Sequence, residues 1–224
     1  MIMADRMEGK RFENDWTMDE LGDIYAYIEK AVTVPANEKI EAEHRVLDLS
    51  RMEEILRDAE LIVLQDCGCK TMRGNCDAPR GTCISLDAAA EDALKDTRYN
   101  SRVVTLDEAL EALRVSHEAG LVHMAYTMEG DEYPSPICSC CPCCCHTLSG
   151  LLRLGLAPVV LTSGKVAVDD SERCTNCGTC VSRCVFRARM MVDGVMAHDP
   201  AKCFGCGLCV STCPANAITL ARKV

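Results

Sequence analysis

The sequence lacks any continuous apolar stretch of the roughly 20 residues that a helix needs to cross a membrane, and a membrane span is therefore excluded. It also lacks an excess of basic residues, because 34 Asp and Glu outnumber 24 Lys and Arg among its 224 residues and give a net charge of −10. A chain of this charge is repelled by phosphate groups. Nucleic acids and anionic lipid surfaces are therefore not expected partners.

The first residues lack the apolar core of a secretory signal. The segment MIMADRMEGKRFENDW is interrupted by charges at Asp5, Arg6, Glu8, Lys10 and Arg11. We therefore expect a cytoplasmic protein whose thiols are held in a reducing compartment. The apolar share of 48% is typical of a folded globular chain.

Cysteine, in contrast, is abundant, with 18 residues in the chain. In a secreted protein this density would predict a disulfide scaffold, but in a reducing compartment it indicates metal binding. The densest stretch is ICSCCPCCCHTL, residues 137–148, in which six cysteines occur between Cys138 and His146. Adjacent thiols such as Cys140 and Cys141 point apart in an extended chain. They can therefore serve opposite sides of a loop or two different metal centres.

The C-terminal part contains an internal duplication. CTNCGTCVSRC at residues 174–184 aligns with CFGCGLCVSTC at residues 203–213, and the duplicated unit spans roughly residues 166–224. Between the two copies, residues 190–197 predict a β-hairpin with a tight turn at Asp193-Gly194.

Each copy has the C-x2-C-x2-C-x3-C spacing by which a chain wraps a [4Fe–4S] cluster. Three thiolates of one tight loop cover three irons, and the distant fourth thiolate crosses to the other cluster. The segment resembles the bacterial-type two-cluster ferredoxins, although Val185 stands where that family commonly has proline. Gly178, Gly205 and Gly207 are expected to let backbone amides approach the cluster sulfides. The resemblance implies one cluster on Cys174, Cys177, Cys180 and Cys213 and a second on Cys203, Cys206, Cys209 and Cys184. Two zinc knuckles are the alternative for this segment.

Upstream of the duplication, three segments begin with the S/T-x-x-E pattern of a capping box. They start at Thr17, Ser50 and Thr105, and apolar residues follow each at helical spacing, up to Ile28 in the first. Strand-like segments follow at residues 61–64 and, after Gly120, at residues 121–126. These patterns predict an α+β fold. We expect a Cys-rich α+β domain over residues 1–150, a connector over 151–165, and a two-cluster ferredoxin domain with a pseudo-two-fold repeat over 166–224.

Ten cysteines lie upstream of the duplication. The chain over about residues 34–224 resembles long ferredoxin-like iron–sulfur proteins of anaerobic bacteria and archaea, through DCGCK at 66–70, CDAP at 76–79, EAGLVH at 118–123 and ICSCCPCCC at 137–145. The resemblance implies electron transfer in an anaerobic cell but fixes no ligand set upstream. The candidate metal ligands are Cys67, Cys69, Cys76, Cys83, Cys138, Cys140, Cys141, Cys143, Cys144 and Cys145.

We expect the first four of these cysteines to combine with part of residues 138–145 and to bind at least one additional iron–sulfur cluster. Lys70 and Ser139 depart from the family pattern and are interpreted as hydrogen-bond donors near the thiols. His146 is an alternative ligand. His123 lies in a predicted strand, His44, His117 and His198 stand alone, and none of these four has a partner for a catalytic pair.

The sequence therefore predicts a protein that relays single electrons at low potential between redox enzymes or electron carriers. Its expected cofactors are two [4Fe–4S] clusters and one or two additional iron–sulfur clusters. The duplicated C-terminal module has no acid, base or nucleophile arranged for turnover, so its expected work is electron relay. We name no catalytic residues and favour a carrier or electron-transfer subunit over an enzyme. Residues 169–224 have a net charge of +2, and the upstream region has a net charge of −12. The acidic upstream region favours docking on basic surfaces of redox partners.

Three alternatives stay open for the upstream cysteines. They can form a structural zinc site. They can handle substrate in a reductase subunit, or they can act as a redox sensor.

Overall fold

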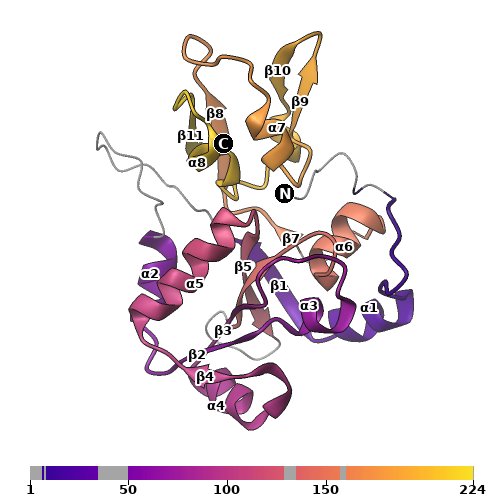
Figure 1. Ribbon diagram of the computed structural model, residues 1–224, viewed down its shortest axis with the longest axis vertical. Coiled ribbons are helices and arrows are strands. Elements are labelled where there is room, and N and C mark those ends of the chain that lie inside the picture. Colours follow the sequence, from indigo (N-terminus) through magenta and orange to yellow (C-terminus); the bar gives the residue numbers. More distant parts are fainter. Residues whose placement is uncertain (1–6, 8, 35–49, 129–134, 157–159, 224) are drawn as a thin grey trace.

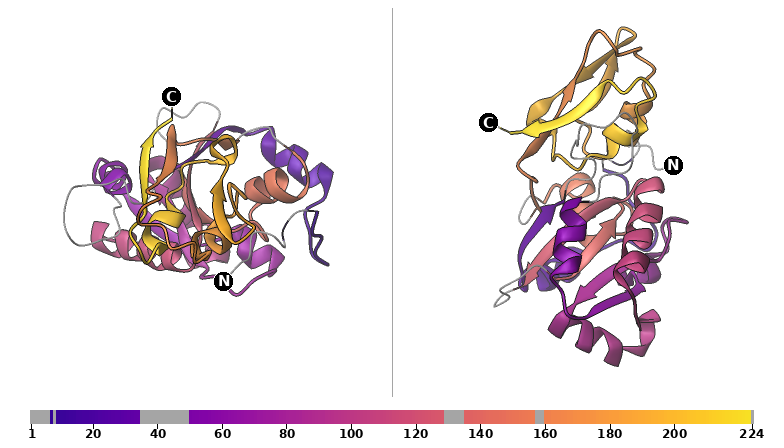
Figure 2. Two further views of the ribbon diagram at one scale, coloured as in Figure 1. Left: turned by 90° about the horizontal axis from the view of Figure 1, so that it is seen from above. Right: turned by 90° about the vertical axis from the view of Figure 1, so that its left-hand side faces the viewer.

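The computed structural model describes residues 7, 9–34, 50–128, 135–156 and 160–223. Figures 1 and 2 show a larger part built around a β-sheet, with the smaller C-terminal part lying at one end of it. Helices and mainly antiparallel strands make up both parts, and the predicted α+β fold is confirmed. In the described part of the chain, no helix has the length and apolar character required to span a membrane.

The larger part contains a seven-stranded sheet with the strand order β4-β2-β3-β6-β5-β1-β7. Neighbouring strands are antiparallel, except that β7 runs parallel to β1. The strands are β1 (Ile28–Thr33), β2 (Ile62–Asp66), β3 (Gly81–Leu86), β4 (Arg102–Val103), β5 (Val122–Met128), β6 (Ile137–Cys140) and β7 (Val160–Leu161). The strands predicted at residues 61–64 and 121–126 are present as β2 and β5.

Helices cover both faces of this sheet. Figures 1 and 2 show α2 and α5 on one side and α1, α3 and α6 on the other. The helices are α1 (Met18–Tyr25), α2 (Ser50–Arg57), α3 (Gly68–Arg73), α4 (Asp87–Lys95), α5 (Leu106–Glu118) and α6 (His146–Arg153), with a 3-10 turn at Thr97–Tyr99.

The three predicted helices correspond to α1, α2 and α5. Capping boxes are present at Thr17 and Thr105, whose hydroxyl oxygens accept hydrogen bonds from the third residue of each helix at 3.2 and 3.3 Å. Ser50 is itself the first residue of α2, and the residue before it lies outside the described range. The placement of Ile28 on the first helix was wrong, because α1 ends at Tyr25 and Ile28 begins β1.

The sheet face under α2 and α5 is an apolar core. Met52 and Leu56 of α2 and Leu113 of α5 pack there against Ile84 of β3 and Ile137 of β6. Since side chains alternate along a strand, the residues next to Ile84 and Ile137 point to the opposite face. That opposite face lies under α1, α3 and α6, and it receives the cysteine side chains of β3 and β6.

The C-terminal part consists of two antiparallel strand pairs and two short helices. Its elements are β8 (Lys165–Asp169), α7 (Thr179–Arg183), β9 (Arg189–Val192), β10 (Val195–His198), a 3-10 turn at Pro200–Lys202, α8 (Leu208–Thr212) and β11 (Ile218–Arg222). β11 pairs with β8 and β10 pairs with β9. The predicted hairpin is confirmed, with positive φ angles of 50° at Asp193 and 81° at Gly194, as a tight type I′ turn requires.

The two parts pack together through a pair of aromatic rings. Phe186 and Phe204 of the C-terminal part stack with centroids 4.4 Å apart, and they belong to one apolar cluster with Val122, Met124 and Leu148 of the larger part. Polar contacts add to this packing, since the Thr33 hydroxyl donates to the Phe204 carbonyl at 2.7 Å. The C-terminal part is therefore held against the sheet by both apolar and polar contacts.

Arg183 of α7 makes a second polar contact between the two parts, at the end of α5. Its guanidinium donates to the backbone carbonyls of His117 and, at 3.1 Å, Glu118 at the end of α5. Gly120, which follows α5 with a φ of +87°, leaves room for it, because a Cβ at this position would lie 2.9 Å from the Arg183 Nη1 atom. The glycine therefore serves both the helix end and the packing of the two parts.

We expect Leu113→Ala to lower the free energy of unfolding by about 2–5 kcal/mol, because it removes a buried side chain that packs between α5 and the sheet. The matched control is Leu94→Ala on α4, where the side chain is 40% exposed. Anaerobic urea denaturation of both variants measures the effect. Equal midpoints for the two variants would contradict this view of the core.

Candidate metal centres

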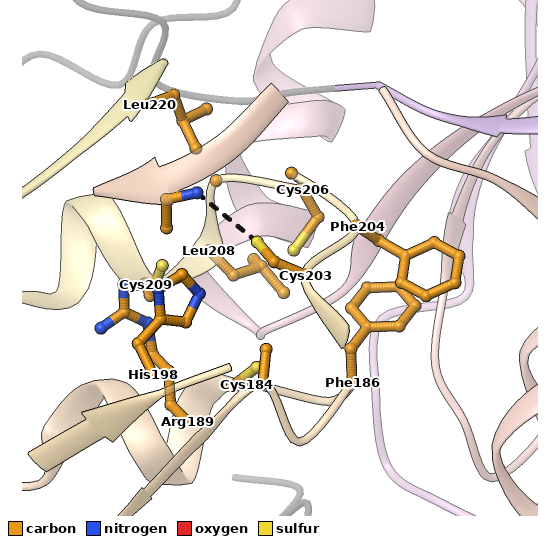
Figure 3. A pocket seen from close by; sticks show the side chains of 14 residues that line it. Cys184, Phe186, Arg189, His198, Cys203, Phe204, Cys206, Leu208, Cys209 and Leu220 are labelled. Atoms are coloured by element: carbon orange, nitrogen blue, oxygen red, sulfur yellow. Dashed lines mark hydrogen bonds between the residues drawn. The ribbon is translucent and has the colours of Figure 1, made fainter. Parts of the chain in front are cut away.

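Two cavities in the C-terminal part are each lined by four cysteine side chains. We call them the inner cavity, shown in Figure 3 with its four cysteines around one space, and the outer cavity. The inner cavity is lined by Cys184, Cys203, Cys206 and Cys209, and the outer cavity by Cys174, Cys177, Cys180 and Cys213. Each set takes three cysteines from one copy of the repeat and the fourth from the other. The resemblance to two-cluster ferredoxins implies the same two groups, and cluster binding by them stays a prediction.

The space free of protein atoms, open mouths included, is about 350 Å³ in the inner cavity and about 320 Å³ in the outer one. Backbone amides point at two of the cysteine sulfurs: Ala167 N lies 3.5 Å from Cys203 Sγ, and Ala217 N lies 3.3 Å from Cys213 Sγ. Such N–H donors stabilise negatively charged sulfur. The residues of both cavities therefore fit a thiolate-ligated cluster larger than a single ion.

Gly205 lets the chain pass very close to β8 beside the inner cavity. Its φ is +66°, and a Cβ there would lie 2.4 Å from the carbonyl oxygen of Lys165. Gly178 and Gly207 also have positive φ angles, and they precede α7 and α8. The repeated glycines thus permit the two tight loops that carry most of the cysteines.

Arg189 is a buried cation shared by both cavities. Its side chain is 1% exposed and lines the inner cavity. The Nη1 atom donates to Asp169 Oδ1 at 2.7 Å and lies 3.8 Å from Cys180 Sγ, which lines the outer cavity. Burial opposes its charge, but electrostatic attraction to the Cys209 sulfur and the hydrogen bond with Asp169 raise the pKa of Arg189 above its usual range. The guanidinium therefore supplies fixed positive charge to both cysteine sets.

The ten upstream cysteines fall into two spatial groups. The first, which we call the four-thiol site, is compact, and all of its sulfur atoms lie within 4.8 Å of one another. It consists of Cys76, Cys141, Cys143 and Cys144. Within the described residues, no other set of three or more potential ligand atoms is this compact.

The remaining six cysteines form the six-thiol site on the sheet face opposite the apolar core. A continuous series of thiol–thiol contacts joins Cys69, Cys67, Cys83, Cys138, Cys140 and Cys145. The sheet register explains the centre of this series, since Cys83 of β3 lies directly opposite Cys138 of β6 and Cys140 lies on the same face. The Tyr126 hydroxyl lies 3.6 Å from Cys140 Sγ and 3.7 Å from Cys145 Sγ.

This division differs from the grouping expected from the sequence. Cys76 is separated from Cys67, Cys69 and Cys83, because it follows α3 on the loop that leads to β3. Adjacent cysteines, in contrast, point apart as expected for neighbouring residues of an extended chain. Cys140 belongs to the six-thiol site and Cys141 to the four-thiol site.

Lys70 lies between these two sites and is only 1% exposed. Its ammonium group donates to the Thr82 hydroxyl at 2.6 Å and to the Ser139 carbonyl at 2.9 Å. Burial opposes the charged form, but negative charge on the nearby cysteine sulfurs, that of Cys67 first, raises the pKa of Lys70. A buried ammonium of this kind is stable only beside negative charge.

The buried thiols cannot all ionise on their own. Hydrogen bonds from Cys69 and Cys83 lower the pKa of Cys67, whereas burial and the neighbouring Cys140 hold the pKa of Cys145 well above its usual range. Bound metal ions favour the thiolate form and would hold several thiolates in one place. The residues of both upstream sites thus fit metal centres.

His146, the alternative ligand, lies outside the compact four-thiol group. Its ring packs edge-on against Trp16 with centroids 5.9 Å apart, and its Nδ1 atom lies 2.9 Å from the Thr147 hydroxyl oxygen. The structure therefore gives His146 a packing role beside the thiols.

Sequence reasoning missed a contact between two histidines, since His117, which was expected to stand alone, packs on His123. His117 of α5 and His123 of β5 stack with centroids 5.9 Å apart, between Ser211 at 2.7 Å and Ser139 at 3.0 Å. Burial lowers the pKa of His117 to about 4 and that of His123 to about 3, so both are neutral at pH 7. The alternation of residues 121–126 was the available signal, because it places His123 on the face that α5 covers.

The family model for the 4Fe-4S binding domain matches residues 196–219. This segment contains the second copy of the cysteine repeat, and it contributes three of the cysteines that line the inner cavity and one that lines the outer cavity. No curated protein matches the chain. Together with the cysteine groups, the family match supports the conclusion that this is an iron–sulfur protein with a ferredoxin-type 4Fe-4S domain in its C-terminal part.

Proposed function

We propose that this protein relays single electrons at low potential through two bacterial ferredoxin-type [4Fe–4S] clusters and at least one further iron–sulfur cluster upstream. The two cavities with crossed sets of four cysteines are the observation that carries this proposal. A [4Fe–4S] cluster, when bound, accepts and donates one electron at a time. The outer cavity is the entry side, because Cys177 at its edge is exposed to solvent.

The chain's own residues shield the inner cavity from water. Phe186 and Phe204 belong to an apolar cluster that includes Cys184 and Cys206 on the cavity side and Cys140 and Cys145 on the six-thiol side. One continuous apolar region therefore lies between the inner cavity and the six-thiol site. This region supports a relay in which the six-thiol site binds the further cluster.

The domain organisation belongs to the same proposal. We propose an upstream Cys-rich domain over residues 1–150, a connector over 151–165 that contributes β7 to the edge of the sheet, and a ferredoxin domain over 166–224. The charge of −12 on the upstream region supports docking on basic surfaces of redox enzymes or carriers in the cytoplasm of an anaerobic cell.

The upstream sites support a relay better than substrate handling. Seven of the ten upstream cysteines are buried, and Cys69, Cys76 and Cys138 are partly exposed, so most of these sulfurs offer a disulfide substrate no access. The burial therefore favours an electron-transfer role over the alternative of a reductase subunit.

Metal analysis of anaerobically prepared protein tests the number of clusters. We expect about twelve irons and about twelve acid-labile sulfides per chain. Cys138→Ser should remove about four irons and four sulfides and should leave the electron paramagnetic resonance signals of the two ferredoxin clusters unchanged. The matched variant Cys180→Ser should instead disturb the signal of one ferredoxin cluster. About eight irons per chain, unchanged by Cys138→Ser, would contradict a further cluster in the six-thiol site.

Arg189→Gln should lower the reduction potential of at least one ferredoxin cluster, because it removes a buried positive charge that favours the more negative, reduced state. Arg222→Gln, on the exposed end of β11, is the control and should leave both potentials nearly unchanged. Protein-film voltammetry measures the shifts. Cluster reduction potentials that are the same in Arg189→Gln as in Arg222→Gln would show that Arg189 does not tune the clusters.

A further inference from the structure

The spacing of the sulfur atoms in the four-thiol site matches that around a single tetrahedral ion. A regular tetrahedron with zinc–sulfur bonds of about 2.3 Å has sulfur–sulfur edges of about 3.8 Å. Cys76 Sγ lies 3.7 Å from Cys141 Sγ and 3.8 Å from Cys144 Sγ, and Cys144 Sγ lies 4.0 Å from Cys143 Sγ. All four sulfurs therefore fit one coordination sphere.

The other cysteine groups have wider spacing. Of the cysteines that the structure describes, those of the two cavities and the six-thiol site include no three with sulfurs all within 4.8 Å of one another. The four-thiol site thus differs in kind from the sites suited to a cluster, since its four sulfurs leave space for one ion at their centre.

We propose that Cys76, Cys141, Cys143 and Cys144 bind one zinc ion, as a closed structural site. All four coordination positions are filled by thiolates, which is the arrangement of structural zinc centres and leaves no position for substrate. The site joins the loop between α3 and β3, which carries Cys76, to the turn between β6 and α6. The ion therefore cross-links two segments that flank the six-thiol site.

The turn that carries three of the ligands is held from outside by donors to its carbonyl groups. Arg153 Nε donates to the Pro142 carbonyl at 2.7 Å, Asn75 Nδ2 to the Cys143 carbonyl at 3.1 Å, and Trp16 Nε1 to the Cys144 carbonyl at 2.8 Å. These bonds turn the backbone oxygens outward and leave the thiols facing Cys76. Second-layer contacts of this kind fix ligand orientation at metal sites.

Arg153 is itself fixed by a buried ion pair. Its guanidinium donates to both carboxylate oxygens of Asp15 at 2.7 and 2.8 Å, and the Arg153 side chain is 0% exposed. Burial raises the pKa of Asp15, but its hydrogen bonds with Arg153 and with backbone amides outweigh burial and lower that pKa to about 2. The N-terminal segment that contains Asp15 and Trp16 thus belongs to the support of the four-thiol site.

The test is metal content of the full chain, purified anaerobically with its iron–sulfur clusters. We expect about one zinc per chain in addition to iron, and zinc-edge X-ray absorption should show four sulfurs at about 2.3 Å with no neighbouring metal. Cys143→Ser should lower the zinc content at least several-fold and leave the ferredoxin signals intact. Cys76→His should retain zinc, because three cysteines and one histidine also form structural zinc sites.

Cys177→Ser is the matched control, since zinc that had replaced iron in the outer cavity would be lost from this variant. Zinc retained in Cys143→Ser, or lost in Cys177→Ser, would overturn the proposal. Iron in place of zinc, or a metal neighbour in the X-ray absorption of the unmodified protein, would overturn it as well. The measurement on the unmodified protein decides the question even where a variant does not fold.

Discussion

The structure depends on the compensation of buried negative charge. Eighteen cysteines lie in a chain of 224 residues, and most of them are partly or fully buried. Buried thiolates repel one another, and burial alone keeps thiols protonated. Two buried cations, Lys70 upstream and Arg189 in the C-terminal part, are placed beside the thiols. Two cations balance only a small part of the charge of so many thiolates, and in our account bound metal supplies the rest.

The strand β6 and the turn after it distribute the cysteines of residues 138–145 between two sites. Alternation along β6 places Cys138 and Cys140 on the face opposite the apolar core, where Cys83 meets them across β3. The following turn directs Cys141, Cys143 and Cys144 to Cys76, and Cys145 returns to the first group. Six cysteines in so short a segment thus have a structural reason, because adjacent residues place their thiols in different sites.

The repeat and the tight loops that carry its cysteines were predictable from the sequence, because cysteine spacing within a loop is a local property. The hairpin at Asp193-Gly194 and the capping boxes at Thr17 and Thr105 were predictable for the same reason. The division of the upstream cysteines was not, because it depends on the pairing of β3 with β6 and on the path of the loop after α3. The stacking of His117 on His123 likewise results from how α5 packs on the sheet. Alternation along a strand indicates the sheet face on which a residue such as His123 lies, but it does not indicate which residue of a distant segment it meets.

The central claim is that the eighteen cysteines form four centres, of which three hold iron–sulfur clusters and one holds zinc. Anomalous X-ray diffraction from anaerobically grown crystals, recorded at the iron and zinc absorption edges, tests it most directly. We expect iron density in the inner cavity, the outer cavity and the six-thiol site, and a single zinc peak between Cys76, Cys141, Cys143 and Cys144. Iron density at the four-thiol site, or no iron in the two cavities, would contradict it.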